Sequence, residues 1–163
     1  MELERRFDFR KIFGILYVTT FLVYLIAGFI PAGATTPEIS EALVIPSIHL
    51  ASGVTNVSLV DHKLDTPDTV VGSYQPTENK TFLIGHSTTA FSNLKNIDIG
   101  DYLYYGGLKY RVVKTSLQKK SDVDMKKILA DTDIKTVVMM TCAGELVGGG
   151  DATHRFIVTA VLA

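Results

Sequence analysis

The strongest constraint on the fold is a series of short β-rich runs that begins near Leu43 and continues to the end of the chain. Gly, Pro, Asn and Asp, which favour turns, separate these runs. The candidate strands cover residues 42–48, 54–59, 80–84, 102–105, 108–117, 136–141 and 155–162. About seven strands with few helices predict a mainly β domain, either a small barrel or a sandwich.

Two local signals refine this pattern. Gly106-Gly107 lies between tyrosine-rich runs and predicts a hairpin with a primed turn. One helix is expected, with Ser121 and Asp122 as capping residues and apolar residues at helical spacing up to Leu129. A second short turn is expected over residues 90–94.

Near the N-terminus, residues 12–30 form an uncharged apolar run of 19 residues. A helix of that length nearly spans the hydrocarbon layer of a bilayer. Basic residues precede the run and none follows until Lys63, so the positive-inside rule predicts a cytoplasmic N-terminus. A signal peptide cleaved at Ala32-Gly33-Ala34 is the competing interpretation, but secretory apolar regions are usually shorter. A buried helix of a soluble core fits the one-sided basic flank poorly.

The expected organisation therefore has four parts. Residues 1–11 form a basic cytoplasmic segment, 12–30 a transmembrane helix, 31–41 a linker, and 42–163 one extracytoplasmic domain. The 163-residue chain carries a net charge of −1, which gives no indication of a nucleic-acid partner. Its single cysteine excludes an intramolecular disulfide and any metal site built on paired cysteines.

That cysteine, Cys142, follows the apolar run 136–141, which reads as a buried strand that ends at the thiol. Taken alone, a free cysteine is more often a packed apolar side chain than a nucleophile. An unpaired thiol outside the cell is an oxidation liability, however, and the small residues Ala143 and Gly144 leave its approach open. Because only the thiolate attacks, a nucleophilic Cys142 needs a base or a cation nearby.

His86 and Arg155 are the candidate partners. His86 directly follows the apolar strand 80–84 and a glycine, whereas His49 is predicted within a strand and His62 in a polar turn. A histidine there can protonate a leaving amine near neutral pH, and a structural histidine in a loop is the alternative. Arg155 opens the last predicted strand. It is either a solvated surface charge or a donor to an oxyanion.

The acidic residues give a weaker signal. Asp98 with Asp101, or Asp122 with Asp124, could contribute to a calcium site, which needs about six to eight oxygen ligands. Turn and helix-cap chemistry explains such residues better, so no cofactor or metal is expected.

Taken together, these segments resemble the sortase family of membrane-anchored cysteine transpeptidases over residues 43–162. Ile45-Pro46-Ser47-Ile48 is similar to a first-strand motif of the family, and Phe82 to Ser87 matches the segment of the catalytic histidine. Phe91, Leu94, Gly100 and Asp101 follow the family pattern. Met139 to Cys142 stands where sortases carry T-L-x-T-C, with Val138 and Met139 in place of Thr and Leu, and Arg155 leads a final strand of the family type.

The resemblance implies a single closed β-barrel of about eight strands with one or two short helices. It implies Cys142 as the nucleophile, His86 as the acid and base, and Arg155 as a donor to the substrate or oxyanion. Substrate contacts would come from Thr141, Ser87 and Ala143. The expected partners are surface proteins with an LPxTG-like C-terminal sorting signal and an amine nucleophile, from a peptidoglycan precursor or another protein. The expected location is the cell membrane, with one membrane pass and an extracytoplasmic catalytic domain.

Two other functions remain open at this point. One is a catalytically silent, membrane-anchored β-barrel that binds peptides or envelope components. The presence of all three residues, His86, Cys142 and Arg155, argues against it. The other is a different extracytoplasmic cysteine enzyme such as an L,D-transpeptidase, but Met139-Met140-Thr141-Cys142 does not resemble the S-x-G-C motif usual there.

Overall fold

The computed structural model describes residues 41–60, 63–147 and 151–163. The predicted membrane segment 12–30 and most of the predicted linker lie outside these ranges. In the part of the chain that is described, no helix is long and apolar enough to cross a membrane.

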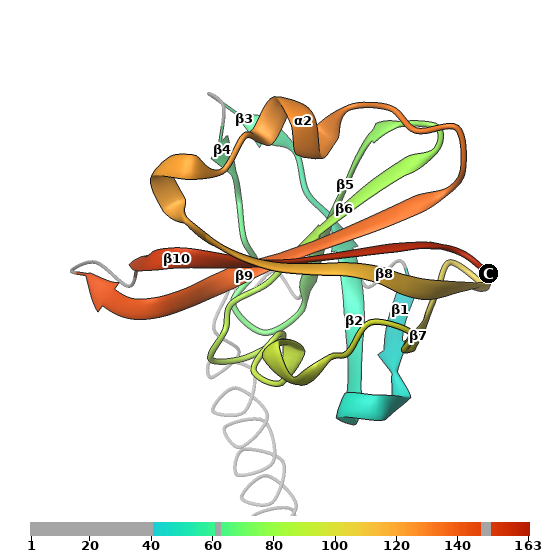
Figure 1. Cartoon of the computed structure of the whole chain (residues 1–163), viewed down its shortest axis with the longest axis horizontal. Helices are drawn as coiled ribbons and strands as arrows, with labels where there is room; N and C mark the ends of the chain where they lie inside the picture. The colour runs from blue at the N-terminus through green and yellow to red at the C-terminus, as the bar shows by residue number, and fades with distance from the viewer. Residues whose placement is uncertain (1–40, 61–62, 148–150) are drawn as a thin grey trace, which may run out of the picture. The chain divides into compact units, whose positions relative to one another are not determined.

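Eight strands form a closed barrel in the order β1-β2-β5-β6-β9-β10-β8-β7, and most of it is visible in Figure 1. The pairs β2–β5 and β6–β9 are parallel, and the other barrel pairs are antiparallel. A separate two-stranded ladder joins β3 to β4. The strands are β1 (Glu41–Ile45), β2 (Leu50–Asn56), β3 (Leu59–Val60), β4 (Lys63–Leu64), β5 (Val71–Thr77), β6 (Lys80–Ile84), β7 (Tyr102–Tyr105), β8 (Leu108–Lys119), β9 (Thr136–Val147) and β10 (Asp151–Leu162). The short helices are η1 (Pro46–Ile48), η2 (Leu94–Asn96), η3 (Lys120–Asp122) and α2 (Met125–Leu129).

The mainly β prediction is confirmed, and the barrel is the correct alternative to the sandwich. Predicted strands 80–84 and 102–105 coincide with β6 and β7. The predicted hairpin joins β7 to β8, and both of its glycines have positive φ, 57° at Gly106 and 72° at Gly107. That conformation is the one a primed turn requires.

The first two predicted strands have different ends, and one strand was not predicted. The first stops at Ile45 because Pro46 begins the 3-10 turn η1, and His49 ends that turn with φ 52° rather than lying in a strand. The run predicted at 54–59 is β2, which starts earlier, at Leu50, and ends at Asn56. β5 was not predicted, because Gly72 and Pro76 within it are typical of turns.

The predictions around the thiol also need correction. Cys142 does not end its strand, since β9 continues to Val147. Arg155 does not open β10, which begins at Asp151. The long hairpin formed by these two strands extends beyond the barrel, at the left of Figure 1. Pairing between β9 and β10 therefore continues past the cysteine.

The predicted helix is present but shorter. Residues 120–122 form η3, so Ser121 and Asp122 do not cap α2. The N-cap is Asp124, whose side chain accepts a hydrogen bond from the backbone N–H of Lys127. The predicted turn at 90–94 leads into η2.

Strand β9 is buried on both faces from Thr136 to Thr141. Val137 and Met139 belong to the core inside the barrel, whereas Val138 and Met140 belong to a second cluster on its outer face. Partly buried side chains from α2 and its neighbours cover that outer cluster: Leu64, Ile84, Val123, Met125, Ile128 and Leu129. Cys142 follows Val138 and Met140 at every second position, so its side chain belongs to the outer face.

Candidate active site

The pairing of β9 with β10 places Arg155 directly opposite Cys142. Directly opposite residues of an antiparallel pair share a face of the sheet, with Cβ atoms about 5 Å apart. The candidate nucleophile and the candidate cation are therefore neighbours on the outer face. The side chain of Arg155 is only 13% exposed. The alternative interpretation, that Arg155 is a solvated surface charge, is therefore wrong.

His86 reaches the same level through the parallel pairing of β6 with β9. The register runs from Lys80 opposite Thr136 to Ile84 opposite Met140. β6 ends at Ile84, so His86 lies in the turn directly after it, while Cys142 lies two residues beyond Met140 on β9. Cys142 and Arg155 thus come from two paired strands, and His86 follows the end of the neighbouring strand β6.

A buried hydrogen bond holds the segment before the histidine against β9. The Thr141 hydroxyl donates to the carbonyl oxygen of Gly85 at 2.8 Å, and Thr141 is only 5% exposed. This bond joins the residue before His86 to the residue before Cys142. The substrate contact suggested for Thr141 stays a prediction, and its geometry favours positioning the two site residues.

Gly85 is required by a close approach on the other side of the same segment. A Cβ atom there would lie 2.9 Å from the Cδ2 atom of Phe91. Phe91 is buried in the barrel core, and its backbone N–H donates to the carbonyl of His86 at 3.0 Å. The turn after β6 is therefore anchored to the core while the half-buried His86 remains accessible.

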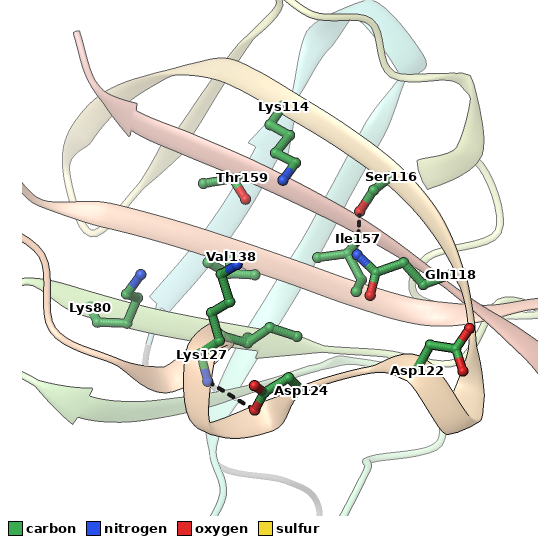
Figure 2. A pocket seen from close by; sticks show the side chains of 11 residues that line it. Lys80, Lys114, Ser116, Gln118, Asp122, Asp124, Lys127, Val138, Ile157 and Thr159 are labelled. Carbon is green, nitrogen blue, oxygen red and sulfur yellow. Dashed lines mark hydrogen bonds between the residues drawn. The ribbon is translucent and has the colours of Figure 1, made fainter.

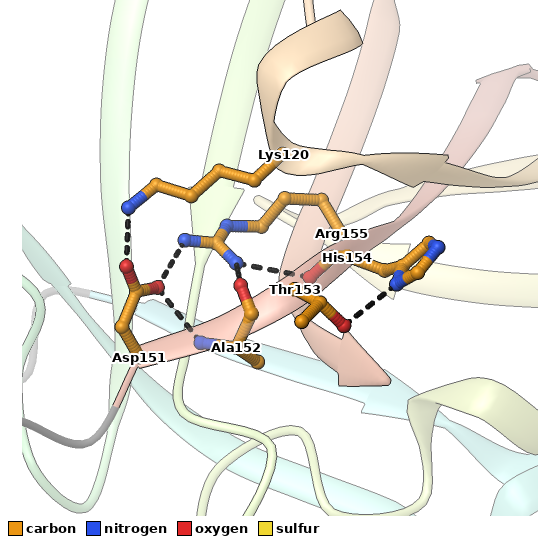
Figure 3. Close-up of polar contacts among 6 residues, drawn as sticks. All are labelled: Lys120, Asp151, Ala152, Thr153, His154 and Arg155. Carbon is orange, nitrogen blue, oxygen red and sulfur yellow. Dashed lines mark hydrogen bonds and ion pairs between the residues drawn. The ribbon is translucent and has the colours of Figure 1, made fainter. Parts of the chain in front are cut away.

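Polar contacts hold the guanidinium of Arg155, as Figure 3 shows. Nη1 donates to the carbonyl oxygens of Ala152 and His154, each at 2.9 Å. Nη2 donates to Oδ1 of Asp151 at 2.7 Å. Because a guanidinium has five N–H donors, two remain for a substrate after these three bonds.

Asp151 links Arg155 to the 3-10 helix η3. Its other carboxylate oxygen forms an ion pair with Lys120, in η3 directly after β8. Hydrogen bonds from Lys120 and then from Arg155 hold the pKa of Asp151 well below its usual range. The carboxylate is therefore ionised at neutral pH and neutralises part of the cationic charge beside the thiol.

An apolar groove of about 490 Å³ leads away from this end along the outer face. The strands provide its floor with Phe82, Ile84, Met140 and Arg155. The β8–β9 connection provides one wall with Lys120, Val123, Met125, Lys126 and Leu129, and Leu59 and Leu64 complete the lining. The groove thus starts at Arg155 and has the apolar surface that an extended peptide would bury.

The remaining predicted site residues lie near this centre. Ser87 and Ala143 are half-buried and follow His86 and Cys142, and their contact with substrate stays a prediction. His154 lies one residue before Arg155, so its side chain projects from the opposite face, where Thr153 Oγ1 is 2.8 Å from its Nδ1 atom. Among the described residues, no three His, Cys, Asp or Glu side chains come close enough to hold a metal ion.

Sequence reasoning missed Asp151 and Lys120. In a regular strand, Asp151 and Arg155 would be about 13 Å apart. The contact forms because the long side chain of Arg155 reaches back along β10, so that Nη2 lies 2.7 Å from Oδ1 of Asp151. An acidic residue four before the arginine is too common a pattern to have revealed the contact.

Comparison with known proteins supports the same interpretation. The family model for the sortase domain matches residues 43–163. Sortase A of Corynebacterium diphtheriae, as a lid mutant, is similar in structure, with 22% identity, 80% of this chain and 73% of that chain covered, and a TM-score of 0.59. Sortase A of Listeria monocytogenes is 15% identical, with 77% of this chain and 87% of that chain covered and a TM-score of 0.59. Sortase C-1 of Actinomyces oris is 22% identical, with 85% of this chain and 81% of that chain covered and a TM-score of 0.56.

A search of curated proteins found no significant match. The structural neighbours are below 25% identity, so they establish the fold, an eight-stranded barrel of the sortase type. The match of the family model covers most of the sequence and includes His86, Cys142 and Arg155. The chain therefore belongs to the sortase family, whose members are generally cysteine transpeptidases.

Proposed function

We propose that the protein is a cysteine transpeptidase that cleaves an LPxTG-like sorting signal and transfers the cleaved protein to an amine of the cell envelope. The observation that supports the proposal most is the register of β9 with β10, which pairs Cys142 with Arg155, together with the position of His86 directly after β6, the other neighbour of β9. A nucleophile, a proton carrier and a permanent cation at the end of an apolar groove suit acyl transfer to and from a peptide.

In the first half-reaction, the Cys142 thiolate attacks the carbonyl carbon of the Thr–Gly bond. Negative charge develops on the carbonyl oxygen, and the two remaining donors of Arg155 are available to stabilise it. The C–N bond then breaks and His86, in its protonated form, gives a proton to the departing glycine amine. The product is a thioester between Cys142 and the threonine carbonyl.

In the second half-reaction, an amine attacks the thioester and neutral His86 accepts its proton. The C–S bond breaks, which restores the Cys142 thiolate and forms a new amide. The amine would come from a peptidoglycan precursor or from a neighbouring protein. The groove would hold the apolar part of the sorting signal during both steps.

We also propose that residues 12–30 anchor the enzyme in the cell membrane, with the barrel outside. The uncharged run and its basic flank support this placement. Substrates tethered to the same membrane would then meet the site at a raised effective concentration.

Mass spectrometry of the full-length chain after incubation with a library of LPxTG-like pentapeptides tests the proposal. We expect a covalent adduct at Cys142 that hydroxylamine releases, because hydroxylamine cleaves thioesters. Cys142→Ala should form no adduct. Adduct formation by that variant, or peptide binding without turnover by the wild type, would contradict the proposal, the latter in favour of a silent peptide-binding barrel.

A further inference from the structure

A second hollow of about 400 Å³ lies on the same outer face, next to the other side of α2. Its lining is polar where the groove is apolar, and it carries none of the proposed catalytic residues. The lining residues are Lys80, Lys114, Ser116, Gln118, Asp122, Asp124, Lys127, Ile128, Val138, Ile157 and Thr159. These come from β6, β8, β9, β10 and the η3–α2 segment, so the hollow is built by elements far apart in the sequence.

Three lysines concentrate positive charge in this hollow. Figure 2 shows Lys114 on β8 and Lys127 on α2 entering it from opposite sides, with Lys80 on β6 at its edge. None of their ammonium groups forms a hydrogen bond or an ion pair within the described part of the chain. Lys114 and Lys127 are therefore left to solvent or to a ligand, whereas Lys80 also has the carboxylate of Asp131 nearby.

Lys80 is the most informative of the three. It is only 5% exposed, although lysines are almost never so buried unless they are paired. Burial lowers the pKa of its ammonium group, and the nearby carboxylate of exposed Asp131 opposes that effect. The ammonium group forms no hydrogen bond in the described part of the chain and is not itself fully buried, so an anion that enters the hollow can reach it.

Neutral donors accompany the lysines. The Ser116 hydroxyl accepts a hydrogen bond from Nε2 of Gln118 at 3.4 Å, which leaves its own proton available to donate. The hydroxyl of Thr159 also lines the hollow, from the neighbouring strand β10. Lysine binds phosphate as a compact point charge, and hydroxyls complete the coordination of oxyanions.

Two carboxylates lie on the η3–α2 side, and local donors engage both. Asp122 accepts from the Ser121 hydroxyl at 2.8 Å, and Asp124 accepts from the backbone N–H of Lys127 at 3.2 Å. Figure 2 places the Asp122 carboxylate away from Lys80 and Lys114. The lysine side of the hollow therefore keeps its positive character.

We propose that this hollow is a binding site for a multiply charged oxyanion, held by Lys80, Lys114 and Lys127 with the hydroxyls of Ser116 and Thr159. The ligand class is a compact phosphate or polycarboxylate group. The site is distinct from the peptide groove, and its existence does not depend on the transpeptidase proposal.

Isothermal titration calorimetry of the full-length chain in a neutral detergent tests this site, with inorganic pyrophosphate as the probe at constant ionic strength. We expect a one-to-one complex, with binding at least about ten-fold weaker in the double variant Lys114→Gln/Lys127→Gln, because it loses two charge-assisted contacts. Both lysines are exposed, so the variant should fold normally.

The matched control is Lys95→Gln/Lys119→Gln, which removes two exposed lysines that do not line the hollow. A second titration uses citrate. Binding of pyrophosphate alone identifies a phosphate ligand, binding of citrate alone identifies a carboxylate ligand, and binding of both identifies a general oxyanion site. Absence of binding by either probe, or equal weakening in the two double variants, would overturn the proposal.

Discussion

The groove and the lysine hollow lie next to opposite sides of α2 and share the same strands, yet their chemistry differs. On β6, Phe82 and Ile84 line the groove, whereas Lys80, two residues earlier on the same face, lines the hollow. The five-residue helix contributes Leu129 to the groove and Ile128 to the hollow. One sheet face thus offers an apolar surface beside the proposed catalytic end and a cationic surface beyond α2. The comparison predicts that substitutions on the two sides affect different ligands.

The largest effect is expected at the catalytic end of the groove. Arg155→Ala removes the guanidinium of the residue that is paired with Cys142, and we expect kcat/KM for acyl-enzyme formation to fall about 10²- to 10³-fold. Pyrophosphate binding should not change, since Arg155 does not line the hollow. Single-turnover kinetics with a sorting-signal peptide measure the effect. Arg111→Ala, which removes an exposed arginine of β8, is the control. Equal rates for the two variants would exclude the oxyanion role.

A smaller effect is expected along the wall that separates the two sides. Leu129→Ala shortens a groove-lining side chain and should raise KM for the peptide about ten-fold. Ile128→Ala is the matched control, because Ile128 is adjacent in α2 and packs on the same outer cluster but lines the hollow. Steady-state kinetics and thermal unfolding of both variants separate binding from stability. An equal rise in KM for Ile128→Ala would show that α2 acts as a unit.

The proposed catalytic site and the lysine hollow also differ in how much of each could be predicted from the sequence. His86, Cys142 and Arg155 could be predicted because each follows or lies in an apolar run that forms a strand. The pairing of Cys142 with Arg155 and the position of His86 beside β9 could not be predicted, since they depend on the strand order and on the registers of β6–β9 and β9–β10, which local residue patterns do not determine.

The lysine hollow was even harder to predict from the sequence. Lys80, Lys114 and Lys127 are far apart in the sequence, and each looks like an ordinary solvated charge. Lys80 is buried only because β6 lies inside the sheet and the β8–β9 connection packs on its outer face. The unpredicted strand β5 and the Asp151 contact likewise depend on tertiary pairing, which overrides local turn propensity.

Asp151 tests how far the catalytic end depends on a positioned guanidinium. Asp151→Asn keeps the shape but weakens the contacts to Arg155 and Lys120, so we expect kcat to fall about five-fold with KM unchanged. The lowered pKa of Asp151 means that its carboxylate stabilises the fold above the ordinary value of about 3.9 and that this stabilisation is lost as the pH falls through the lowered pKa. Thermal unfolding should therefore show a larger difference between wild type and variant at pH 7 than at pH 2. A difference of equal size at both pH values would have another cause.

The smallest effect is expected at Lys80, because the burial of this lysine in the hollow should lower the stability of the fold, whereas the apolar groove should not. Burial lowers the pKa of Lys80, so the folded state binds its proton more weakly than the unfolded state does. Wild-type stability should therefore rise with pH from that lowered pKa up to the ordinary lysine value of about 10.4. Lys80→Met keeps the length of the side chain and removes the charge. We expect a higher thermal midpoint than wild type at pH 7 and a difference that shrinks toward pH 10.

The control for this prediction is Lys114→Met, which removes an exposed ammonium from the same hollow and should leave the thermal midpoint nearly unchanged. Lys80→Met should also weaken pyrophosphate binding, because the ammonium of Lys80 is one of the three proposed contacts. A less stable Lys80→Met variant at pH 7 would mean that attraction to Asp131 outweighs the cost of burial. Lys80 would then stabilise the barrel itself, and the contrast between an apolar groove and a hollow kept for a ligand would rest on Lys114 and Lys127 alone.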